Sequence, residues 1–369
     1  MKRIVLKGYY GFGNLGDDVV MLTCTRWLKN LFPKAQVLVA TASKHGEYII
    51  PFTQGMVEDI VPVSPEPEAD LIVHGGGGTF YDFDIGNRSY HVLNRLIHLV
   101  GEEIFSEGLM TYRKLKGWPS NLDTRRIAVG VGLGTFTPSS RKYYHKIAEL
   151  TSLEMILPRD PDSYKVLKQM RISGEIVQSS DLAFMSQYWL PPEVKPGTTF
   201  KRIGFVVKHW PCDTGYLAVL GKTARALKEQ GYLVTIFLFE KNHDLPIIKE
   251  FGDFEVKVWC PWTGSLVNYL RLLASNSLLV TSRAHGAIIG AAFGIPSICI
   301  GIEPKLNQVA NMFPRSAIFM NLALTFNGLY DSIISGLEVH ADLVLNDFDE
   351  NQTVLLNSLS KVEKYLQKY

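Results

Sequence analysis

An arginine and a histidine stand two positions apart in the segment TSRAHGAIIGAAFGIP, residues 281–296. Arg283 and His285 follow an expected strand, 277–281, and precede a helix built of small residues. A guanidinium can hold a carboxylate or phosphate through two hydrogen bonds, and an imidazole titrates near neutral pH. At a helix N-terminus this pattern predicts an anion clamp beside a proton-transfer group, with Ser282 as a further contact. The alternative is a structural turn, in which both side chains would need buried partners.

Two further segments place cations after expected strands. GIEPKLN, residues 301–307, carries Glu303 and Lys305, and LPRDPDS, residues 157–163, carries Arg159. Lys305 is predicted to anchor an anion, and Arg159 to hold a carboxylate or phosphate. The alternatives are a solvated loop lysine and an arginine paired with a neighbouring aspartate at the surface.

The glycine-rich segment GYYGFGNLGDD, residues 8–18, lies between an expected strand and an expected helix. It matches GxGxxG, but dinucleotide binding also expects an acidic residue at the end of the second strand. That strand, 36–41, is followed by Ala-Ser, and Asp17 would repel a pyrophosphate. We therefore expect either a different ligand, contacted by Asn14 and Asp17, or a tight turn with an aspartate cap.

A second glycine run, HGGGGTFYD at residues 74–82, follows an apolar strand. Consecutive glycines pack poorly, so they favour a place where backbone N–H groups approach a ligand, here Gly76 and Gly77. The alternative is a close crossing of two backbones. Asp82 in this run and Asp181 after the strand at 175–178 are candidate substrate contacts.

The elements that must position these residues alternate between short β-branched strands and helices, which is typical of α/β proteins with parallel sheets. Residues 188–199 contain three prolines and predict a linker. We expect two Rossmann-like domains facing a cleft, at 1–190 and 200–335, and a helical segment at 336–369 that packs back on them. Ligands of such sheets bind beyond the carboxyl ends of the strands.

Composition narrows the function classes. The chain has 369 residues and a net charge of +2, which gives no bulk attraction to nucleic acid. No apolar run is long enough to span a membrane, and the four cysteines are far apart. Scattered histidines and cysteines give no metal-ligand spacing, so no metal and no cofactor are expected, and a reducing cytoplasm suits the cysteines.

In order and spacing, these motifs resemble those of the polysaccharide pyruvyl transferase family from about residue 8 to residue 310. The resemblance implies a fold like the GT-B glycosyltransferases and transfer of pyruvate from phosphoenolpyruvate to two sugar hydroxyls as a ketal. It also implies that Arg283, His285, Arg159 and Lys305 contact the donor, with the acceptor on the side of the first domain. Leu182 stands where the family often has proline.

Under this hypothesis His285 transfers a proton, Arg283 and Arg159 clamp the anions, and the candidate aspartates contact sugar hydroxyls or act as base. The acceptor is a glycan or a lipid-linked saccharide, and the location is the cytoplasm or the inner face of the membrane. A peripheral membrane contact and a homo-oligomer stay open. The alternatives are a glycosyltransferase that uses a nucleotide sugar and a non-catalytic carbohydrate-binding protein on the same fold.

Overall fold

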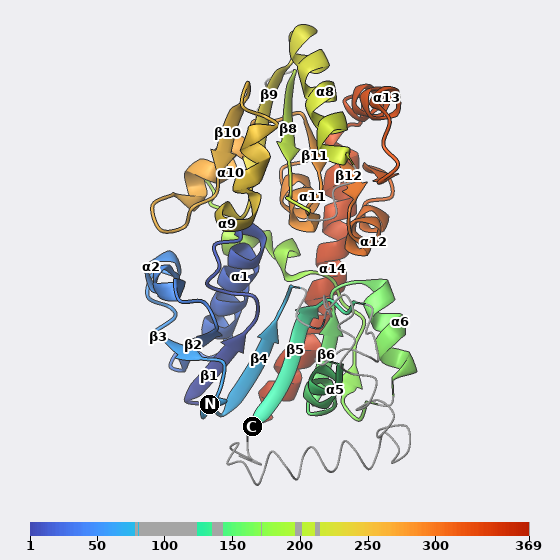
Figure 1. Ribbon diagram of the computed structural model, residues 1–369. Coiled ribbons are helices and arrows are strands. Elements are labelled where there is room, and N and C mark those ends of the chain that lie inside the picture. Colours follow the sequence, from blue (N-terminus) through green and yellow to red (C-terminus); the bar gives the residue numbers. More distant parts are fainter. Residues whose placement is uncertain are drawn as a thin grey trace, which may run out of the picture. The chain divides into compact units, whose positions relative to one another are not determined.

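The chain, as a computed structural model, forms two compact α/β units (Figure 1). The structure describes residues 1–77, 80, 124–134, 143–170, 172–195, 201–210 and 215–368. The first unit comprises Met1–Gly11, Cys24–Leu182 and Asn357–Tyr369, and the second comprises Phe12–Thr23 and Ala183–Leu356. Residues 12–23 therefore pack with the second unit although they follow the first strand of the chain.

The first unit is built on one parallel sheet of seven strands. Its strands run in the order β3-β2-β1-β4-β5-β6-β7, and they are β1 (Arg3–Lys7), β2 (Gln36–Thr41), β3 (Asp59–Pro62), β4 (Leu71–Gly75), β5 (Arg125–Val131), β6 (Met155–Pro158) and β7 (Glu175–Ile176). The helical segments between them are α1 (Leu15–Leu31, of which residues up to Thr23 belong to the second unit), η1 (Gly46–Tyr48), α2 (Ile49–Phe52), α5 (Tyr143–Thr151) and α6 (Pro161–Gln169). The strand order reverses between β1 and β4, the place where such sheets bind ligands.

The second unit repeats this plan with six parallel strands. They run in the order β10-β9-β8-β11-β12-β13, with β8 (Arg202–Val206), β9 (Leu233–Leu238), β10 (Glu255–Val258), β11 (Leu278–Thr281), β12 (Ser297–Gly301) and β13 (Ala317–Asn321). The helical segments are η3 (Leu182–Phe184, at the boundary), α7 (Ser186–Trp189), α8 (Tyr216–Glu229), α9 (Lys241–Asp244), η4 (Leu245–Lys249), α10 (Leu266–Ala274), α11 (Ala284–Ala291), α12 (Pro304–Met312), α13 (Phe326–Gly336) and α14 (Ala341–Leu366). Here the order reverses between β8 and β11.

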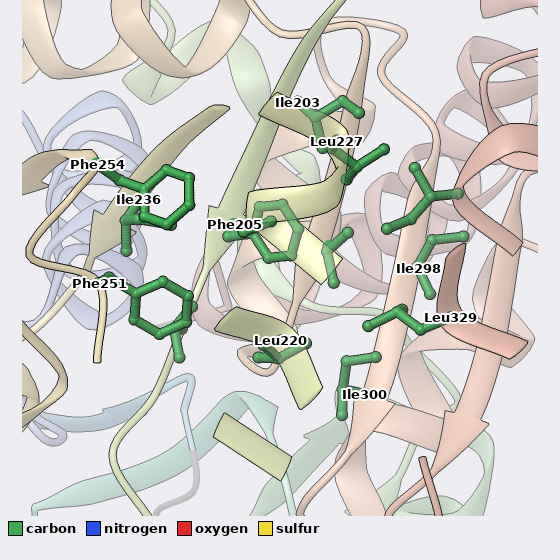
Figure 2. Packing of buried hydrophobic residues seen from close by; sticks show 14 of the residues in the cluster. Ile203, Phe205, Leu220, Leu227, Ile236, Phe251, Phe254, Ile298, Ile300 and Leu329 are labelled. Carbon is green, nitrogen blue, oxygen red and sulfur yellow. The ribbon is translucent and has the colours of Figure 1, made fainter. Parts of the chain in front are cut away.

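One face of the second sheet carries a large apolar core (Figure 2). Alternate residues of the central strands point into it, for example Ile203 and Phe205 of β8. Helices α8 and α13 cover them with Leu220, Leu227 and Leu329. Burial of these side chains removes apolar area from water. Because side chains alternate along a strand, the other residues of the strands point to the opposite face, which α11 and α12 cover.

Helix α11 lies unusually close to its sheet because it is built of glycine and alanine. A Cβ atom added at Gly286 would lie 2.2 Å from Thr281 Oγ1, and one at Gly290 would lie 2.5 Å from Leu279 Cδ1. Both distances are shorter than any real contact. The small residues therefore bring the first turn of α11 close to the carboxyl end of β11.

The strands expected at 36–41 and 277–281 are confirmed as β2, with the same bounds, and as β11, which begins one residue later. The strand expected at 175–178 is the shorter β7. The last helix, α14, begins at Ala341 and ends at Leu366, inside the helical segment expected at 336–369. The first half of α14 is mostly polar, but Val344, Asp347 and Phe348 are buried, and their spacing places them on one face of the helix. The predicted helix 90–100 lies outside the described residues. No helix that the structure describes has both the length and the apolar character needed to cross a membrane.

Replacing Gly286 by alanine should lower the free energy of unfolding. The added methyl group overlaps Thr281 at 2.2 Å, and overpacking of this kind costs about 1–3 kcal/mol. The matched control is Gly252→Ala, whose Cβ would find nothing nearer than 3.7 Å. Urea unfolding of both variants measures the difference, and equal midpoints would contradict the tight packing of α11.

Candidate active site

The polar residues of the second unit gather where the strand order reverses. Lys208 lies two residues beyond β8, and Arg283 lies two residues beyond β11. Ser282 joins these strand ends, because its hydroxyl oxygen accepts the Lys208 backbone N–H at 2.8 Å. The central strands of the sheet thus deliver a lysine and an arginine to the same edge.

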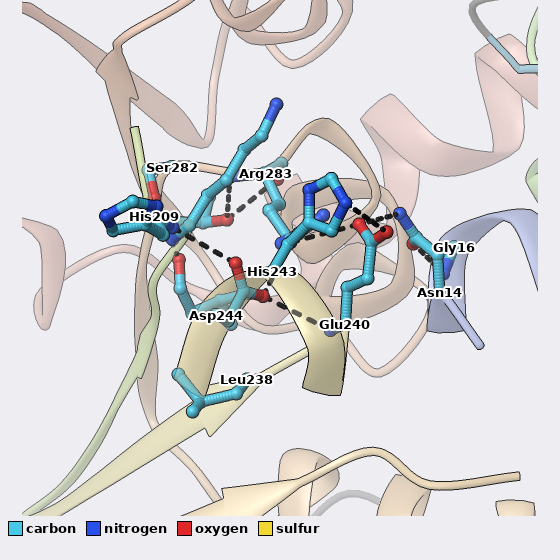
Figure 3. A network of polar contacts seen from close by, with 12 residues as sticks. Asn14, Gly16, His209, Leu238, Glu240, His243, Asp244, Ser282 and Arg283 are labelled. Carbon is cyan, nitrogen blue, oxygen red and sulfur yellow. Dashed lines mark hydrogen bonds and ion pairs between the residues drawn. The ribbon is translucent and has the colours of Figure 1, made fainter. Parts of the chain in front are cut away.

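Arg283 is buried and is held by two carboxylates (Figure 3). Its Nη2 lies 2.5 Å from Asp244 Oδ2 and 3.5 Å from Glu240 Oε2. Burial lowers the pKa of Arg283, but the carboxylates of Asp244 and Glu240 outweigh it and leave that pKa raised. Asp244 is fixed in turn, because it accepts the His209 backbone N–H at 3.0 Å. The guanidinium is therefore charged and fixed in direction.

Glu240 also fastens the glycine-rich loop to the second unit. Asn14 donates from Nδ2 to Glu240 Oε2 at 3.1 Å, as Figure 3 shows. The backbone N–H of Leu15 donates to the Phe239 carbonyl at 2.9 Å. Asn14 and Glu240 thus form a single antiparallel β-bridge just beyond β9. Because Glu240 also contacts Arg283, this bridge places the residue before α1 near that arginine.

Asp17 lies in that first turn and is buried. Burial raises the pKa of Asp17 to about 6, although the neighbouring His285 and Lys305 act in the opposite direction. Asp18 beside it has a different partner, since it accepts a 2.7 Å hydrogen bond from Trp259 Nε1. Asp17 is thus a carboxyl group that can take up or release a proton near neutral pH.

His285 lies in the first turn of α11, directly against Gly16. A Cβ atom at Gly16 would lie 2.1 Å from His285 Nδ1, so only glycine fits there. The loop and the helix therefore place the imidazole against the residue that precedes Asp17, and its charge acts on the Asp17 carboxyl group.

Glu303 connects two lysines at the same edge of the sheet. Its Oε1 lies 2.8 Å from Lys208 Nζ, and its Oε2 lies 2.9 Å from Lys305 Nζ. Burial opposes ionisation, but the two ammonium groups hold the pKa of Glu303 at about 2. The second unit thus brings together seven of the predicted residues, which are Asn14, Asp17, Ser282, Arg283, His285, Glu303 and Lys305.

Arg159 belongs to the first unit and follows β6. It is buried, and its Nε lies 3.5 Å from Asp160 Oδ2 and 2.5 Å from the position of a Cβ at Gly132. Asp160 caps α6 by accepting the Ser163 backbone N–H at 2.7 Å. The guanidinium therefore lies flat on a glycine, with a helix cap as its neighbour.

The other predicted residues of the first unit are backbone and carboxylate positions. Gly76 and Gly77 have φ angles of 66° and 72°, which explains the need for glycine. The Gly76 N–H donates to the Val129 carbonyl at 2.7 Å, so it serves the sheet. Asp181 is buried, and Asp82 lies outside the described residues.

The sequence matches the family model described as polysaccharide pyruvyl transferase over residues 14–304, which is most of the chain. The chain belongs to the polysaccharide pyruvyl transferase family. The match includes every predicted site residue except Lys305. A search of the curated proteins finds no match to this sequence.

Solved structures show the fold of this family member. S. aureus MnaA in a co-structure with UDP has a TM-score of 0.61 at 10% identity, covering 100% of this chain and 97% of its own. UDP-GlcNAc 2-epimerase from Neisseria meningitidis, bound to UDP-GlcNAc, has a TM-score of 0.57 at 10% identity and full coverage, 100% of both chains. Anabaena HepE in complex with UDP-glucose has a TM-score of 0.56 at 9% identity, again with 100% of both chains. The family member thus has a GT-B-like fold of two parallel-sheet domains.

Three residues of the site were missed in the sequence: Lys208, Glu240 and Asp244. Lys208 and Glu240 each stand two positions beyond a strand, which is also where Arg283 stands. Asp244 lies at the end of the short helix α9, and only its contact with Arg283 identifies it. In the described part of the chain, no three His, Cys, Asp or Glu side chains are grouped to hold a metal ion.

Removing the carboxylate of Asp244 should destabilise the protein strongly. The Asp244→Asn change leaves Arg283 charged and buried, and a broken buried pair costs about 3–5 kcal/mol. The control is Asp253→Asn, whose side chain is 80% exposed and lies 3.9 Å from Arg225. That control should change the free energy of unfolding by less than about 1 kcal/mol. Equal urea midpoints for the two variants would contradict the central place of this pair.

Asp17→Asn should change how stability depends on pH. The pKa of Asp17 is raised from 3.8 to about 6 in the folded state, so the folded protein binds the proton more tightly than the unfolded chain. The resulting stabilisation is fully present below pH 3.8 and is lost as the pH rises through 6. Between pH 4 and pH 8 the free energy of unfolding of the variant should therefore rise by about 3 kcal/mol relative to that of wild type. Asp331→Asn, an exposed change on α13, is the control. Parallel stability curves for Asp17→Asn and wild type would show that burial does not raise this pKa.

Proposed function

We propose that the protein transfers pyruvate from phosphoenolpyruvate to two hydroxyl groups of a glycan sugar and forms a cyclic ketal. The observation that carries this proposal is the buried carboxyl group of Asp17, on which His285, Lys305 and Arg283 all act electrostatically. The site combines fixed cations for a small anion with two groups suited to proton transfer. Membership of the pyruvyl transferase family supports the same reaction.

The donor carries a carboxylate and a phosphate, and both need cationic partners. Arg283 and Lys305 supply these in the second unit, and Arg159 is the candidate in the first. Because Arg283 is held by Asp244 and Glu240, its direction is set before the donor binds. Preorganised charge of this kind stabilises a transition state without further reorganisation.

The proton steps use His285 and Asp17. Imidazolium at His285 gives a proton to the methylene carbon of the donor, which becomes a methyl group. The first sugar hydroxyl bonds to the adjacent carbon and loses its proton to Asp17. Phosphate then leaves with the electrons of its C–O bond and takes up the proton held by Asp17. The second hydroxyl bonds to the same carbon and gives its proton to His285, which regains the one it gave up. The products are the ketal and hydrogen phosphate, so atoms and charge balance and both groups are restored.

The acceptor is proposed as a glycan or a lipid-linked saccharide of polysaccharide biosynthesis. We place the reaction in the cytoplasm, and a lipid-linked acceptor would bring it to the inner face of the membrane. Asp181 and Asp82 remain candidates for contacts with sugar hydroxyls. A homo-oligomer likewise remains a prediction.

A nucleotide sugar is the alternative donor, because the similar solved structures were obtained with UDP or UDP-sugars. Titration calorimetry with phosphoenolpyruvate, UDP-sugars and GDP-sugars separates the two proposals. Binding of phosphoenolpyruvate alone supports pyruvyl transfer. Binding of a nucleotide sugar without phosphoenolpyruvate would replace it with glycosyl transfer, and binding of neither donor would favour a carbohydrate-binding role.

His285→Gln should abolish ketal formation while the protein stays folded. The assay incubates the protein with phosphoenolpyruvate and a panel of cell-envelope glycan precursors, and mass spectrometry detects the added pyruvate. Loss of proton transfer should lower the rate at least about a hundredfold. The matched control is His340→Gln, an exposed histidine of the same unit, which should keep the wild-type rate. Near-wild-type turnover by His285→Gln would remove His285 from the mechanism.

A further inference from the structure

Lys208 belongs to no motif singled out in the sequence, yet it shares a carboxylate with Lys305. The two ammonium groups lie 2.8 Å and 2.9 Å from different oxygens of Glu303. These three residues together carry two positive charges and one negative charge. Their side chains differ in exposure, at 18% for Lys208 and 24% for Lys305 against 6% for Glu303. The carboxylate is therefore buried beneath two cations that solvent can reach.

Glu303 is placed to hold the lysines. It occupies the N-cap position of α12, but its side chain makes no cap hydrogen bond within the described residues. Both of its oxygens are used by the ammonium groups instead. A lysine ammonium has three donors, so each can bond Glu303 and still donate to an anion.

Lys208 is held at its backbone and at its ammonium group. Its backbone N–H donates to Ser282 at 2.8 Å, and its carbonyl accepts from the Tyr216 hydroxyl group. Its ammonium also lies 4.9 Å from the centre of the Trp210 ring, a cation–π contact. A long side chain held in this way loses less entropy when it binds a ligand.

The charge of Arg283 is balanced differently. Its guanidinium has two carboxylates within 3.5 Å, Asp244 and Glu240. Lys208, Lys305 and Glu303 together carry one net positive charge, whereas Arg283 with its two carboxylates carries one net negative charge. A phosphoryl group is therefore attracted more strongly to the two ammonium groups than to the compensated arginine.

We propose that Lys208 and Lys305, held by Glu303, form the phosphoryl-binding pair of this site. The identity of the anion as the donor phosphate rests on the proposed function, whereas the binding of a phosphoryl group does not. In the reaction, the pair would hold the phosphate while it leaves as the free ion.

Lys208→Met tests the proposal, because it keeps the length of the side chain and removes its charge. The dissociation constant of inorganic phosphate, measured by titration calorimetry, should rise about tenfold to a hundredfold, the range for a lost charged hydrogen bond. The KM for phosphoenolpyruvate should rise by a similar factor. Inhibition by pyruvate, which has the carboxylate but no phosphate, should change little. Lys208→Arg keeps the charge and should recover most of the phosphate affinity.

The matched control is Lys222→Met on α8, whose ammonium lies 4.7 Å from the centre of the Phe326 ring. It removes a lysine with a similar ring contact and should leave phosphate binding unchanged. Circular dichroism melting of each variant checks that the fold is retained.

The outcomes separate this proposal from the proposed function. Weaker phosphate binding by Lys208→Met supports the pair even if wild type forms no ketal. If Lys208→Met forms the ketal with an unchanged KM and binds phosphate with unchanged affinity, the proposal that the two lysines bind the phosphoryl group is wrong. Pyruvyl transfer would still be supported in that case. Absence of phosphate binding to wild type would also overturn the pair.

Discussion

The ion pair between Arg283 and Asp244 is the interaction on which the site in the second unit depends. A buried guanidinium is tolerated only when carboxylates and hydrogen bonds replace the water that it loses. Asp244 and Glu240 fill this need from the segment after β9. Glu240 then has a second task, because it also accepts from Asn14. The need to neutralise the buried Arg283 therefore positions α9, which carries Asp244, and, through Glu240, the glycine-rich loop at Asn14.

This arrangement explains why residues 12–23 pack with the second unit. The loop after β1 leaves the first sheet and bonds to the end of β9 through Leu15 and Asn14. These bonds, with that from Trp259 to Asp18, hold the first turn of α1 and its Asp17 in the second unit. The raised pKa of Asp17 is a consequence of burial, and burial is a consequence of where the loop is held. An acid–base group is thus created by a contact between segments that are more than 200 positions apart.

The sequence predicted the strands and the conspicuous cations well, because both leave local signals. Alternating β-branched runs mark the strands, and Arg283 and His285 follow one of them directly. The edge strands β3 and β13 were missed. β3 is a four-residue strand that ends in proline, DIVP, and β13 has the sequence AIFMN, whose apolar residues do not alternate with polar ones. The partners of Arg283 were missed for another reason. Nothing near Asp244 in the sequence states that it will face Arg283, since only the fold joins them.

Close packing at two glycines also fixes the position of His285. His285 lies between two glycines that cannot be replaced without overlap, because Gly286 packs on Thr281 and Gly16 packs on the imidazole itself. Thr281 also binds both backbone polar groups of Arg283, at 3.0 Å to the N–H and 2.7 Å to the carbonyl. The turn that carries the arginine and the histidine is therefore fixed by its backbone and its neighbours together. Gly16, the last glycine of the GxGxxG pattern, lets the imidazole of His285 approach the loop closely, and Gly286 lets the helix that carries His285 approach the sheet.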